Sequence, residues 1–529
     1  MSDPAWFKTA VFYEVPIYAF GDANGDGTGD IAGLTERLDY LQWLGIDCLW
    51  ILPFYQSPLR DGGYDVSDFR AVLPAYGTVE DVRHLVAEVH RRGMRIIADF
   101  VVNHTSDQHA WFQEARRPGS PTRDRYVWTD DPKKWGEARV IFTDTHDSNW
   151  TWDDSAGAYF WHRFFDHQPD LNYDNADVRR EVENAIRFWM EIGLDGLRLD
   201  AVPYLFERDG TNGENLPETH AYLKRLRAMV DREFPGSILL AEANQWPEDV
   251  VDYFGDGDEC HMAFHFPVMP RLFMSLKRQS AESVIDILAR TPAIPDNAQW
   301  GIFLRNHDEL TLEMVTPEER AYMYEQYAPD PAMRKNLGIR RRLAPLVDGD
   351  RRRIELLYGL LLSLPGSPIL YYGDEIGMGD MYELEDRDGV RTPMQWDATA
   401  GAGFSPASPK DLYLPVVSAP GYTPAEVNVA AQREDAGSLL QWVRSMLELR
   451  RAHAVFGIGD FEPVSAEHSA LFAFKRSDAT SSVLVIANMS DAAIATTLEV
   501  TADFTSLLGS REVDDGRVEL GPYGFDWLV

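Results

Sequence analysis

The stretch DVRREVENAIRFWMEIGLDGLRLDAV (177–202) contains the unit from which the fold can be inferred. Apolar residues recur at helical spacing in its first part: Val178, Val182, Ala185, Ile186 and Trp189. This spacing predicts an amphipathic helix, and Gly193 is a residue that can end it. The second part, LDGLRLDAV (194–202), is a nearly continuous apolar run, typical of a strand buried on both faces.

Runs of the second kind recur along the chain, and helical patterns separate them. The eight predicted strands are VFYEVPIYAF (11–20), CLWILPF (48–54), MRIIADFVVN (94–103), LDGLRLDAV (194–202), ILLAEA (238–243), HMAFHFPV (261–268), WGIFLRNHD (300–308) and PILYYGDE (368–375). Eight strands that alternate with helices predict an α/β fold, the (β/α)₈ TIM barrel. An open doubly wound sheet is the structural alternative, but no GxGxxG motif follows the first strand.

Three segments do not follow the barrel pattern. Residues 104–176 are rich in Asp, Trp, Pro and His without sustained periodicity, which predicts a small subdomain inserted after the third strand. Residues 309–352 are predicted to form a second, helical excursion. From residue 455 the pattern changes to short alternating runs, which predict a C-terminal antiparallel β-sandwich over 455–529. The barrel itself then comprises 1–103 and 177–454.

The net charge of the chain indicates which classes of binding partner to expect. The 529 residues carry 50 Lys and Arg against 85 Asp and Glu, so the formal charge is 50 − 85 = −35. Such a chain repels phosphate backbones and anionic lipids, so we expect neither nucleic acid nor membrane as a partner. Because the first residues show no secretory signal and two cysteines provide no disulfide framework, we expect a soluble cytoplasmic protein.

Polar residues gather at the carboxyl ends of the predicted barrel strands, where barrel enzymes build their active sites. They are Asn103, His104, Arg198, Asp200, Glu242, His307 and Asp308. A single residue of this kind would more often be a helix cap or a loop anchor. Seven at one rim predict a functional site.

Three of these residues are carboxylates, and three converging carboxylates can cleave and remake a glycosidic bond. Arg198 lies two residues before Asp200, so both side chains can point to the barrel axis and the guanidinium can keep Asp200 ionised as a nucleophile. Apolar neighbours are expected to raise the pKa of Glu242, which suits a proton donor. His307 precedes Asp308 and is suited to hold sugar hydroxyls. A gap of about 5–5.5 Å between Asp200 and Glu242 would mean retention of configuration, and about 6.5–9.5 Å inversion.

Motifs around these residues resemble a known enzyme family. DFVVNH (99–104), GLRLDA (196–201), LLAEAN (239–244) and RNHDE (305–309) resemble the four signature regions of the α-amylase family of glycoside hydrolases. GGYDVSDF (62–69) and RTPMQW (391–396) are similar to its α-glucosidase-like branch. Longer strings, among them FYEVPIYAFGDANGDGTGD (12–30), RFFDHQPDLNYDN (163–175) and NHDELTLEMVTPEER (306–320), resemble the trehalose synthases of that family.

The resemblance implies an intramolecular transferase that interconverts maltose and trehalose by a retaining double displacement, with minor hydrolysis to glucose. Asp200 would be the nucleophile, Glu242 the acid/base and Asp308 the transition-state stabiliser. Matching positions for the glucosyl unit are Asp65, His104, Arg198, His307 and Arg391. The alternative is an α-glucosidase that hydrolyses maltose or isomaltose-type ends with the same triad. A barrel scaffold with decayed catalytic residues is disfavoured because all three carboxylates are present.

In such a transferase the freed glucose must stay in an occluded pocket. The resemblance implies that four residues hold it or gate the entrance: Arg139, Asn244, Glu309 and Glu313. A surface ion pair and a loop cap are the structural alternatives for these positions. The segment GDMYELED (379–386) departs from the family pattern, which predicts a less tightly enclosed pocket and more hydrolysis.

The Asp- and Gly-rich loop that follows the first strand places oxygen ligands at alternate positions, as in a calcium loop. Its candidate ligands are Asp22, Asn24, Asp26, the carbonyl of Thr28, and Asp30. A plain Gly/Asp-rich turn is the alternative. The resemblance implies structural Ca²⁺ there, with Mg²⁺ as a second option, and a second Ca²⁺ site. The ligands of the second site would be Asn103, Asp170, the carbonyls of Tyr204 and Leu205, and Glu207.

Besides its small-molecule substrate, maltose or trehalose, we expect the protein to form a homo-oligomer. A maltokinase is a further candidate partner that the resemblance suggests. No segment of the sequence identifies a docking surface for it.

Overall fold

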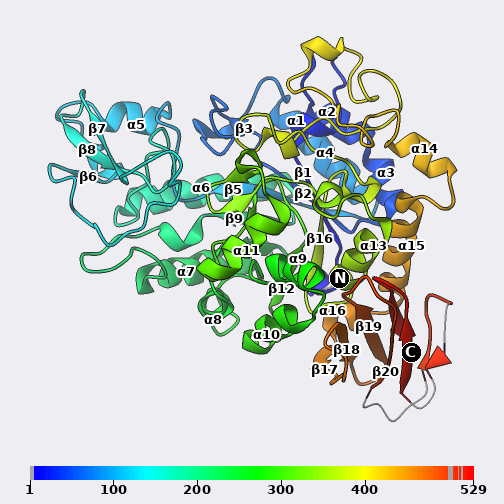
Figure 1. The fold of residues 1–529 in the computed structure, drawn as a ribbon. Helices are drawn as coiled ribbons and strands as arrows, with labels where there is room; N and C mark the ends of the chain where they lie inside the picture. The colour runs from blue at the N-terminus through cyan, green and yellow to red at the C-terminus, as the bar shows by residue number, and fades with distance from the viewer. Residues whose placement is uncertain (1–4, 499–503, 510–511, 514–515) are drawn as a thin grey trace.

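The computed structural model describes residues 5–498, 504–509, 512–513 and 516–529. A closed barrel of eight parallel strands forms its centre, in the order β1-β16-β12-β11-β10-β9-β5-β2 (Figure 1). The strands are β1 Phe12–Val15, β2 Cys48–Ile51, β5 Arg95–Val101, β9 Gly196–Asp200, β10 Ile238–Ala241, β11 Met262–Phe264, β12 Gln299–Phe303 and β16 Ser367–Tyr371. Each coincides with one predicted run, so the prediction of a (β/α)₈ barrel is confirmed.

Helices surround the barrel because each presents one apolar face to it. The longer ones are α4 Val79–Arg91, α6 Ala176–Ile192, α7 Pro217–Glu233, α9 Val268–Arg278, α10 Glu282–Arg290, α13 Arg351–Leu361 and α15 Leu439–Ala452. Helix α6 shows how the sequence achieves this. The Asn175 side chain accepts a hydrogen bond from the backbone N–H of Asp177 and caps the start, the predicted apolar face is buried, and Gly193 ends the helix with φ of 115°.

The remaining helices and helical turns are short connectors. They are η1 Trp6–Lys8, α1 Ile17–Phe20, α2 Ile31–Glu36, α3 Leu38–Leu44, η3 Val202–Tyr204, α8 Pro247–Val250, η4 Val251–Phe254, η6 Asp374–Ile376, η7 Asp388–Val390, η8 Pro409–Asp411, α14 Val429–Glu434 and α16 Val455–Ile458. A two-stranded ladder of β3 Tyr55–Gln56 and β4 Asp68–Val72 flanks the loop that follows β2.

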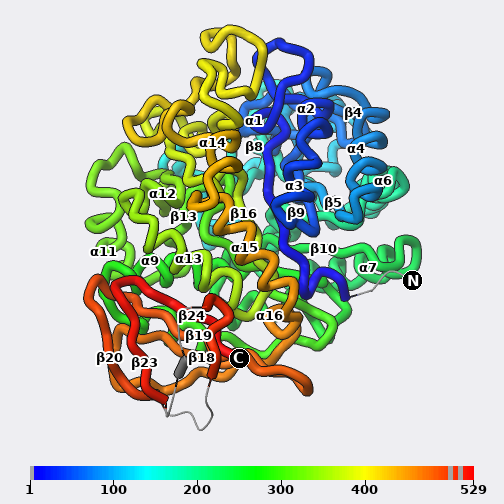
Figure 2. Tube along the Cα trace, turned by 90° about the vertical axis from the view of Figure 1, so that its right-hand side faces the viewer, coloured from blue at the N-terminus to red at the C-terminus, as the bar shows by residue number. Residues whose placement is uncertain are grey.

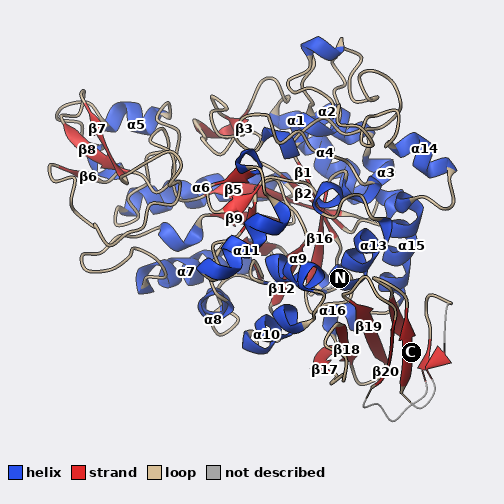
Figure 3. Ribbon diagram, viewed as in Figure 1, coloured by secondary structure: helices blue, strands red, loops and turns tan. Residues whose placement is uncertain are grey.

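The segment between β5 and α6 carries a three-stranded antiparallel sheet of its own, in the order β6-β8-β7. Its elements are α5 Ala110–Ala115, η2 Arg123–Arg125, β6 Trp128–Thr129, β7 Trp150–Asp153 and β8 Ala158–Trp161. Figure 3 shows this sheet standing at one side of the barrel. Trp150 and Trp161 form a small core of their own here, whereas Phe112, Tyr126 and Phe160 join the barrel core, so the segment is anchored to the barrel.

The second excursion is only partly helical, so the prediction of a helical segment over 309–352 is corrected. It contains α11 Pro317–Tyr327, η5 Pro331–Met333 and α12 Leu343–Leu346, but also a sheet of β13 Leu310–Thr311, β14 Arg334–Lys335 and β15 Gly338–Ile339. Asn336 adopts a φ of 46° in the tight turn between β14 and β15. Asn tolerates this left-handed conformation better than most residues, which allows a hairpin where helical structure was expected.

The C-terminal part is antiparallel, as predicted. A four-stranded sheet contains β17 Asp460–Pro463, β18 Leu471–Ser477, β19 Ser482–Asn488 and β24 Phe525–Leu528, and two ladders pair β20 Ile494–Thr497 with β23 Arg517–Leu520 and β21 Phe504–Thr505 with β22 Glu512–Val513. Residues 499–503, 510–511 and 514–515 of the predicted sandwich lie outside the described residues.

Successive side chains of the four-stranded sheet point to opposite faces and pack into two different hydrophobic cores. Phe472 and Phe474 join the barrel core, whereas Leu471 and Ala473 pack with Val518 in a second core. Figure 2 shows these strands below α13, which β24 contacts, and β18 contacts α16. None of the helices in the described ranges is long and apolar enough to cross a membrane.

Candidate active site

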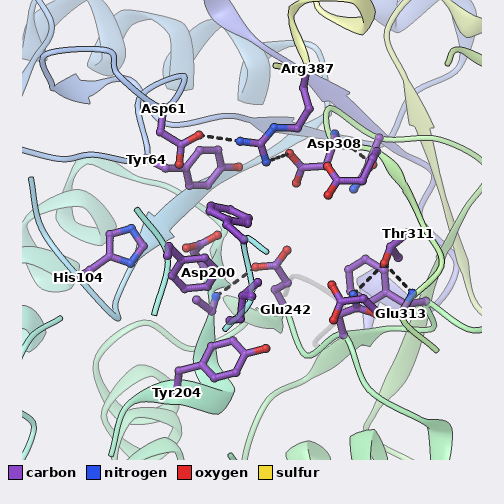
Figure 4. A pocket seen from close by; sticks show the side chains of 18 residues that line it. Asp61, Tyr64, His104, Asp200, Tyr204, Glu242, Asp308, Thr311, Glu313 and Arg387 are labelled. Carbon is purple, nitrogen blue, oxygen red and sulfur yellow. Dashed lines mark hydrogen bonds and ion pairs between the residues drawn. The ribbon is translucent and has the colours of Figure 1, made fainter. Parts of the chain in front are cut away.

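The three predicted catalytic carboxylates meet at the carboxyl end of the barrel. Asp200 is the last residue of β9, Glu242 directly follows β10, and Asp308 lies beyond β12. All three line one cavity of about 120 Å³ (Figure 4). Since parallel strands end at the same rim, residues far apart in sequence converge here.

Arg198 joins the first two carboxylates. Its Nη1 donates to Oδ1 of Asp200 at 2.6 Å and to Oδ1 of Asp99 at 2.6 Å, and its Nη2 lies 2.6 Å from Oε1 of Glu242. Burial raises the pKa of Asp200 to about 6, although the Arg198 charge opposes the rise. Asp200 is therefore mainly ionised at neutral pH, as a nucleophile must be.

Glu242 is in the opposite protonation state at neutral pH. Burial raises its pKa to about 8, Arg198 opposes this rise, and the negative charges of Asp200 and Asp308 add to it. The backbone N–H of Ala201 donates to Glu242 Oε2 at 3.1 Å and holds the carboxyl in place. Two neighbouring carboxyl groups with separated pKa values form the nucleophile and acid pair that glycoside cleavage requires.

Asp308 is surrounded by cationic and polar groups. Arg387 Nη1 donates to its Oδ1 at 2.9 Å, Arg391 Nη2 donates to the same atom at 3.0 Å, and His307 Nε2 lies 3.2 Å from Oδ2. Burial alone would raise the pKa of Asp308, but these neighbours outweigh it and lower the pKa below its usual range. A permanently ionised carboxylate suits the stabilisation of a positively charged transition state.

The predicted glucosyl-binding residues fall into two groups. His104 lines the cavity, and burial lowers its pKa to about 3, so the ring is neutral and its Nε2 has no partner among the described residues. Arg198, His307 and Arg391 instead act through the carboxylates that they hold. His307 also stacks on the ring of Tyr64, with centroids 5.5 Å apart.

The prediction that Asp65 contacts sugar is corrected, because Asp65 does not line the cavity. Its carboxylate accepts hydrogen bonds from Ser57 Oγ at 2.8 Å and from the backbone N–H of Arg60 at 3.0 Å. Asp65 therefore stabilises the loop in which it lies. Asp61, four residues earlier, lines the cavity and binds Arg387 Nη2 at 2.8 Å. Gly62 lies between them with φ of 55° and allows this turn.

Three of the four predicted gating residues line the cavity: Asn244, Glu309 and Glu313. Arg139 comes from the inserted segment and does not itself line the cavity, but it pairs with Glu313, which does. Its Nη1 pairs with Glu313 Oε2 at 2.5 Å, and its Nε donates to Glu214 at 2.8 Å. Asn244 Nδ2 donates to Thr311 Oγ1 at 3.1 Å. Loops from different segments thus build this side of the cavity, the side of Arg139, Asn244 and Glu313, which we call the entrance side.

Comparison with known proteins places this geometry in a family. The sequence model described as alpha amylase, catalytic domain, matches residues 17–328 and 340–459. The chain belongs to the α-amylase family. It is 61% identical to the trehalose synthase/amylase TreS of Mycolicibacterium smegmatis, over 90% of this chain and 81% of the relative. It is 58% identical to TreS of Mycobacterium tuberculosis, over 100% of this chain and 90% of the relative.

A solved structure supports the same fold for this α-amylase family member. The crystal structure of the trehalulose synthase MutB from Pseudomonas mesoacidophila MX-45 superposes with a TM-score of 0.81 and 28% sequence identity. The match covers 99% of both chains. The barrel, the inserted segment and the C-terminal sheet therefore recur together in another member of this architecture.

In the part of the chain that the structure describes, neither predicted metal site shows a cluster of metal-binding side chains. Across the described ranges no three acidic, His or Cys side chains gather as metal ligands, so a cation at either place would also need amide and carbonyl oxygens. In the first loop Asp22 accepts hydrogen bonds from Gly25 N–H and Gly27 N–H, and Asp30 caps α2. These contacts also fit the alternative of a Gly/Asp-rich turn.

The second metal site leaves more oxygen atoms free. Oδ1 of Asn103 and Oδ2 of Asp170 are buried, and neither has a hydrogen-bond partner among the described residues. Burial raises the pKa of Asp170 well above its usual range and that of Glu207 to about 7, and the Glu207 charge adds to the rise at Asp170. Unpartnered oxygens beside two buried carboxyl groups fit a hard cation such as Ca²⁺.

Several site residues escaped the sequence analysis: Glu14, Asp61, Tyr64, Asp99 and Arg387. Glu14 gave a signal, a lone carboxylate inside the apolar run FYEV (12–15), and Asp99 gave a similar one in its strand. Nothing in the local sequence marks Arg387, since its partners Asp61 and Asp308 lie far away along the chain.

Proposed function

We propose that this protein interconverts maltose and trehalose by intramolecular glucosyl transfer, with hydrolysis to glucose as a minor side reaction. The observation that carries the proposal is the pair Asp200 and Glu242. The two share the guanidinium of Arg198 but have pKa values of about 6 and about 8. Identity of 58–61% to the two TreS proteins supports the choice of substrates.

In the first half of the reaction Asp200 attacks the anomeric carbon of the glucosyl unit and forms a β-glucosyl ester. Glu242 protonates the glycosidic oxygen, so the second glucose leaves as a neutral alcohol. Asp308 stabilises the positive charge that develops on the sugar ring. Two carboxylates bound to adjacent nitrogens of one guanidinium favour the shorter spacing of a retaining enzyme.

In the second half the freed glucose turns within the pocket and presents its anomeric hydroxyl. Glu242, now ionised, removes the proton of that hydroxyl, and the new oxygen–carbon bond displaces Asp200. A second inversion at the same carbon gives overall retention and an α,α-1,1 linkage. If water arrives first, hydrolysis results, so the entrance must remain closed during the turn.

The test is incubation with maltose, followed by ¹H NMR of the products. We expect the anomeric signal of α,α-trehalose to exceed the glucose signal. Addition of ¹³C-glucose to the medium should leave the trehalose unlabelled, because the released glucose does not leave the pocket. Glucose as the sole product would reject the transferase and favour an α-glucosidase.

We also infer a structural Ca²⁺ at the second metal site, between Asn103, Asp170 and Glu207. When bound, the ion would supply positive charge to the two buried carboxyl groups and link the inserted segment to the barrel. Chelation should lower the melting temperature, and added Ca²⁺ should restore it. An Asp170→Asn variant should respond less, and a melting temperature insensitive to chelator would contradict the site. Ca²⁺ or Mg²⁺ in the first loop, the homo-oligomer, the maltokinase partner and the cytoplasmic location remain predictions.

A further inference from the structure

Glu14 is a buried carboxyl group without a role in the steps above. It lies in β1, opposite Trp50 of β2 and Tyr371 of β16, and none of its surface is exposed. Burial raises the pKa of Glu14 well above its usual range. A group this costly to bury inside a barrel needs an explanation.

Within the part of the chain that the structure describes, the hydrogen bonds of this carboxyl group go to one residue. Oε1 of Glu14 accepts a hydrogen bond from the backbone N–H of His307 at 3.1 Å and lies within hydrogen-bond distance of the ring Nδ1. Oε2 is buried and has no hydrogen-bond partner among the described residues. Glu14 therefore contacts both the backbone and the ring of His307 and fixes the orientation of the ring.

The other ring nitrogen of His307 faces the active site. Its Nε2 lies 2.8 Å from the hydroxyl of Tyr64 and 3.2 Å from Oδ2 of Asp308. The Tyr64 hydroxyl donates its proton to Asp99 Oδ2 at 2.9 Å, and the ionised Asp308 can only accept. Both neighbours of Nε2 thus present lone pairs, so Nε2 must carry a proton.

The protonation of Nδ1 follows from the environment. Burial lowers the pKa of His307 well below its usual range, so the ring is neutral and a proton on Nε2 leaves a lone pair on Nδ1. That lone pair requires a donor, and Glu14 Oε1 is the polar atom in reach. The unpartnered Oε2 is also less costly as the carbonyl oxygen of an acid than as part of a carboxylate.

We propose that Glu14 is a neutral carboxylic acid that donates a hydrogen bond to Nδ1 of His307 and thereby keeps the proton of His307 on Nε2. Glu14 touches no substrate, so it is a positioning residue. Its effect is to aim an N–H at the Asp308 carboxylate and at the Tyr64 hydroxyl, two groups that line the cavity. With the opposite tautomer, a lone pair would face the Asp308 carboxylate and the donor would be lost. The consequence for turnover rests on the proposed function, whereas the tautomer itself does not.

Two substitutions separate a neutral donor from an ionised acceptor. Glu14→Gln provides a neutral N–H donor to Nδ1, but its amide nitrogen cannot also accept the backbone N–H of His307, so we expect kcat/KM on maltose to fall by less than about tenfold. Glu14→Leu removes the donor, and we expect kcat to fall by about 10²-fold, the typical cost of one oriented donor, with a smaller change in KM. A Glu14→Gln variant as inactive as Glu14→Leu would overturn the proposal.

A matched control reports the cost of changing a buried carboxyl group alone. Glu375 is equally buried and accepts hydrogen bonds from Tyr13 and Tyr40, away from the cavity. Glu375→Gln should leave kcat/KM unchanged. If Glu14→Leu does not fold, a direct measurement on the wild type still determines the tautomer of His307.

That measurement is ¹⁵N NMR of the histidine-labelled wild type, which distinguishes protonated from unprotonated ring nitrogens. We expect the His307 signals, assigned with a His307→Gln variant, to show Nε2–H and an unprotonated Nδ1. The Nδ1–H tautomer or an imidazolium would refute the proposal. A wild type that makes no trehalose would overturn the proposed function and leave this measurement valid.

Discussion

The two sides of the cavity are built in different ways. On the glucosyl side Arg198, Asp99 and Asp200 lie on strands of the barrel and are buried, with three charge-assisted contacts of 2.6 Å around one guanidinium. On the entrance side the contacts join loops. Arg139 of the inserted segment pairs with Glu313, and the side chain of Arg139 is 35% exposed.

This difference separates bond cleavage from retention of the released glucose. Buried groups on strands are held by many contacts, so one change there removes the chemistry. Loop contacts that are partly exposed contribute only about 0.5–1.5 kcal/mol each, which is enough to shift an open–closed equilibrium but too little to alter the barrel. Substitutions on the two sides should therefore change different observables, the cleavage rate on one side and the product ratio on the other.

The largest effect is expected from Asp200→Ala. Without the nucleophile no glucosyl ester forms, so kcat on maltose should fall by about 10⁴-fold or more. Product formation by NMR and a melting curve measure this, and the melting temperature should stay near the wild-type value. Turnover above one hundredth of the wild type would show that the covalent route is wrong.

The pH profile should be the next most informative result. Asp200 must be ionised and Glu242 protonated, so kcat/KM should rise as pH passes about 6 and fall as pH passes about 8. Glu242→Gln should lower kcat by about 10²–10⁴-fold and abolish the alkaline fall. A profile whose alkaline limb persists in Glu242→Gln would assign that limb to another group.

The two sides also differed in how well the sequence predicted them. The strands and the three carboxylates were predicted because apolar runs are local signals and parallel strands end at one rim. The family resemblance implied Asp65, whereas Asp61 lines the cavity, because the sequence does not show which way a loop turns. That direction depends on Leu59, Gly62 and Gly63, whose φ values are 60°, 55° and 103°.

Contacts between residues far apart in the sequence were the second feature that the sequence did not predict. Arg387 reaches Asp61 and Asp308 from a loop beyond the last barrel strand, and Glu14 of β1 reaches His307, which follows β12. No local pattern contains such a pairing, because it depends on the closure of the whole barrel. The hairpin around Asn336 was missed for a related reason, since its strands are only two residues long.

A smaller effect, and one on the product ratio, is expected from Glu313→Gln. The change removes the charge that pairs with Arg139 and loosens the entrance, so the share of glucose among the products should rise about three- to tenfold. The rate of maltose consumption should change less than fivefold, because the carboxylates are untouched. Glu318→Gln is a matched control, since Glu318 is exposed on α11 and pairs with no described residue. Equal product ratios for both variants would show that the ion pair does not gate the pocket.

The smallest effect on the product ratio should come from Asp144→Ala. This substitution tests whether a second contact, besides the Arg139–Glu313 pair, stabilises the entrance side. Ile141 and Phe142 line the cavity between Arg139 and Asp144, and Asp144 Oδ2 accepts a hydrogen bond from the backbone N–H of Asn336 at 2.7 Å. Asp144→Ala removes this contact from an exposed position, so the hydrolysed share should rise about two- to threefold.

Asp144→Asn keeps an acceptor oxygen at the same place and should give a product ratio close to the wild type. Asp147→Ala, an exposed acid three residues further along the loop, controls for the loss of charge. Glucose and trehalose are measured together by NMR at low maltose conversion. If Asp144→Ala and Asp147→Ala give the same ratio, the loop is held by Arg139 and its own packing. If Asp144→Ala slows cleavage as strongly as it alters the ratio, the separation of the two sides fails.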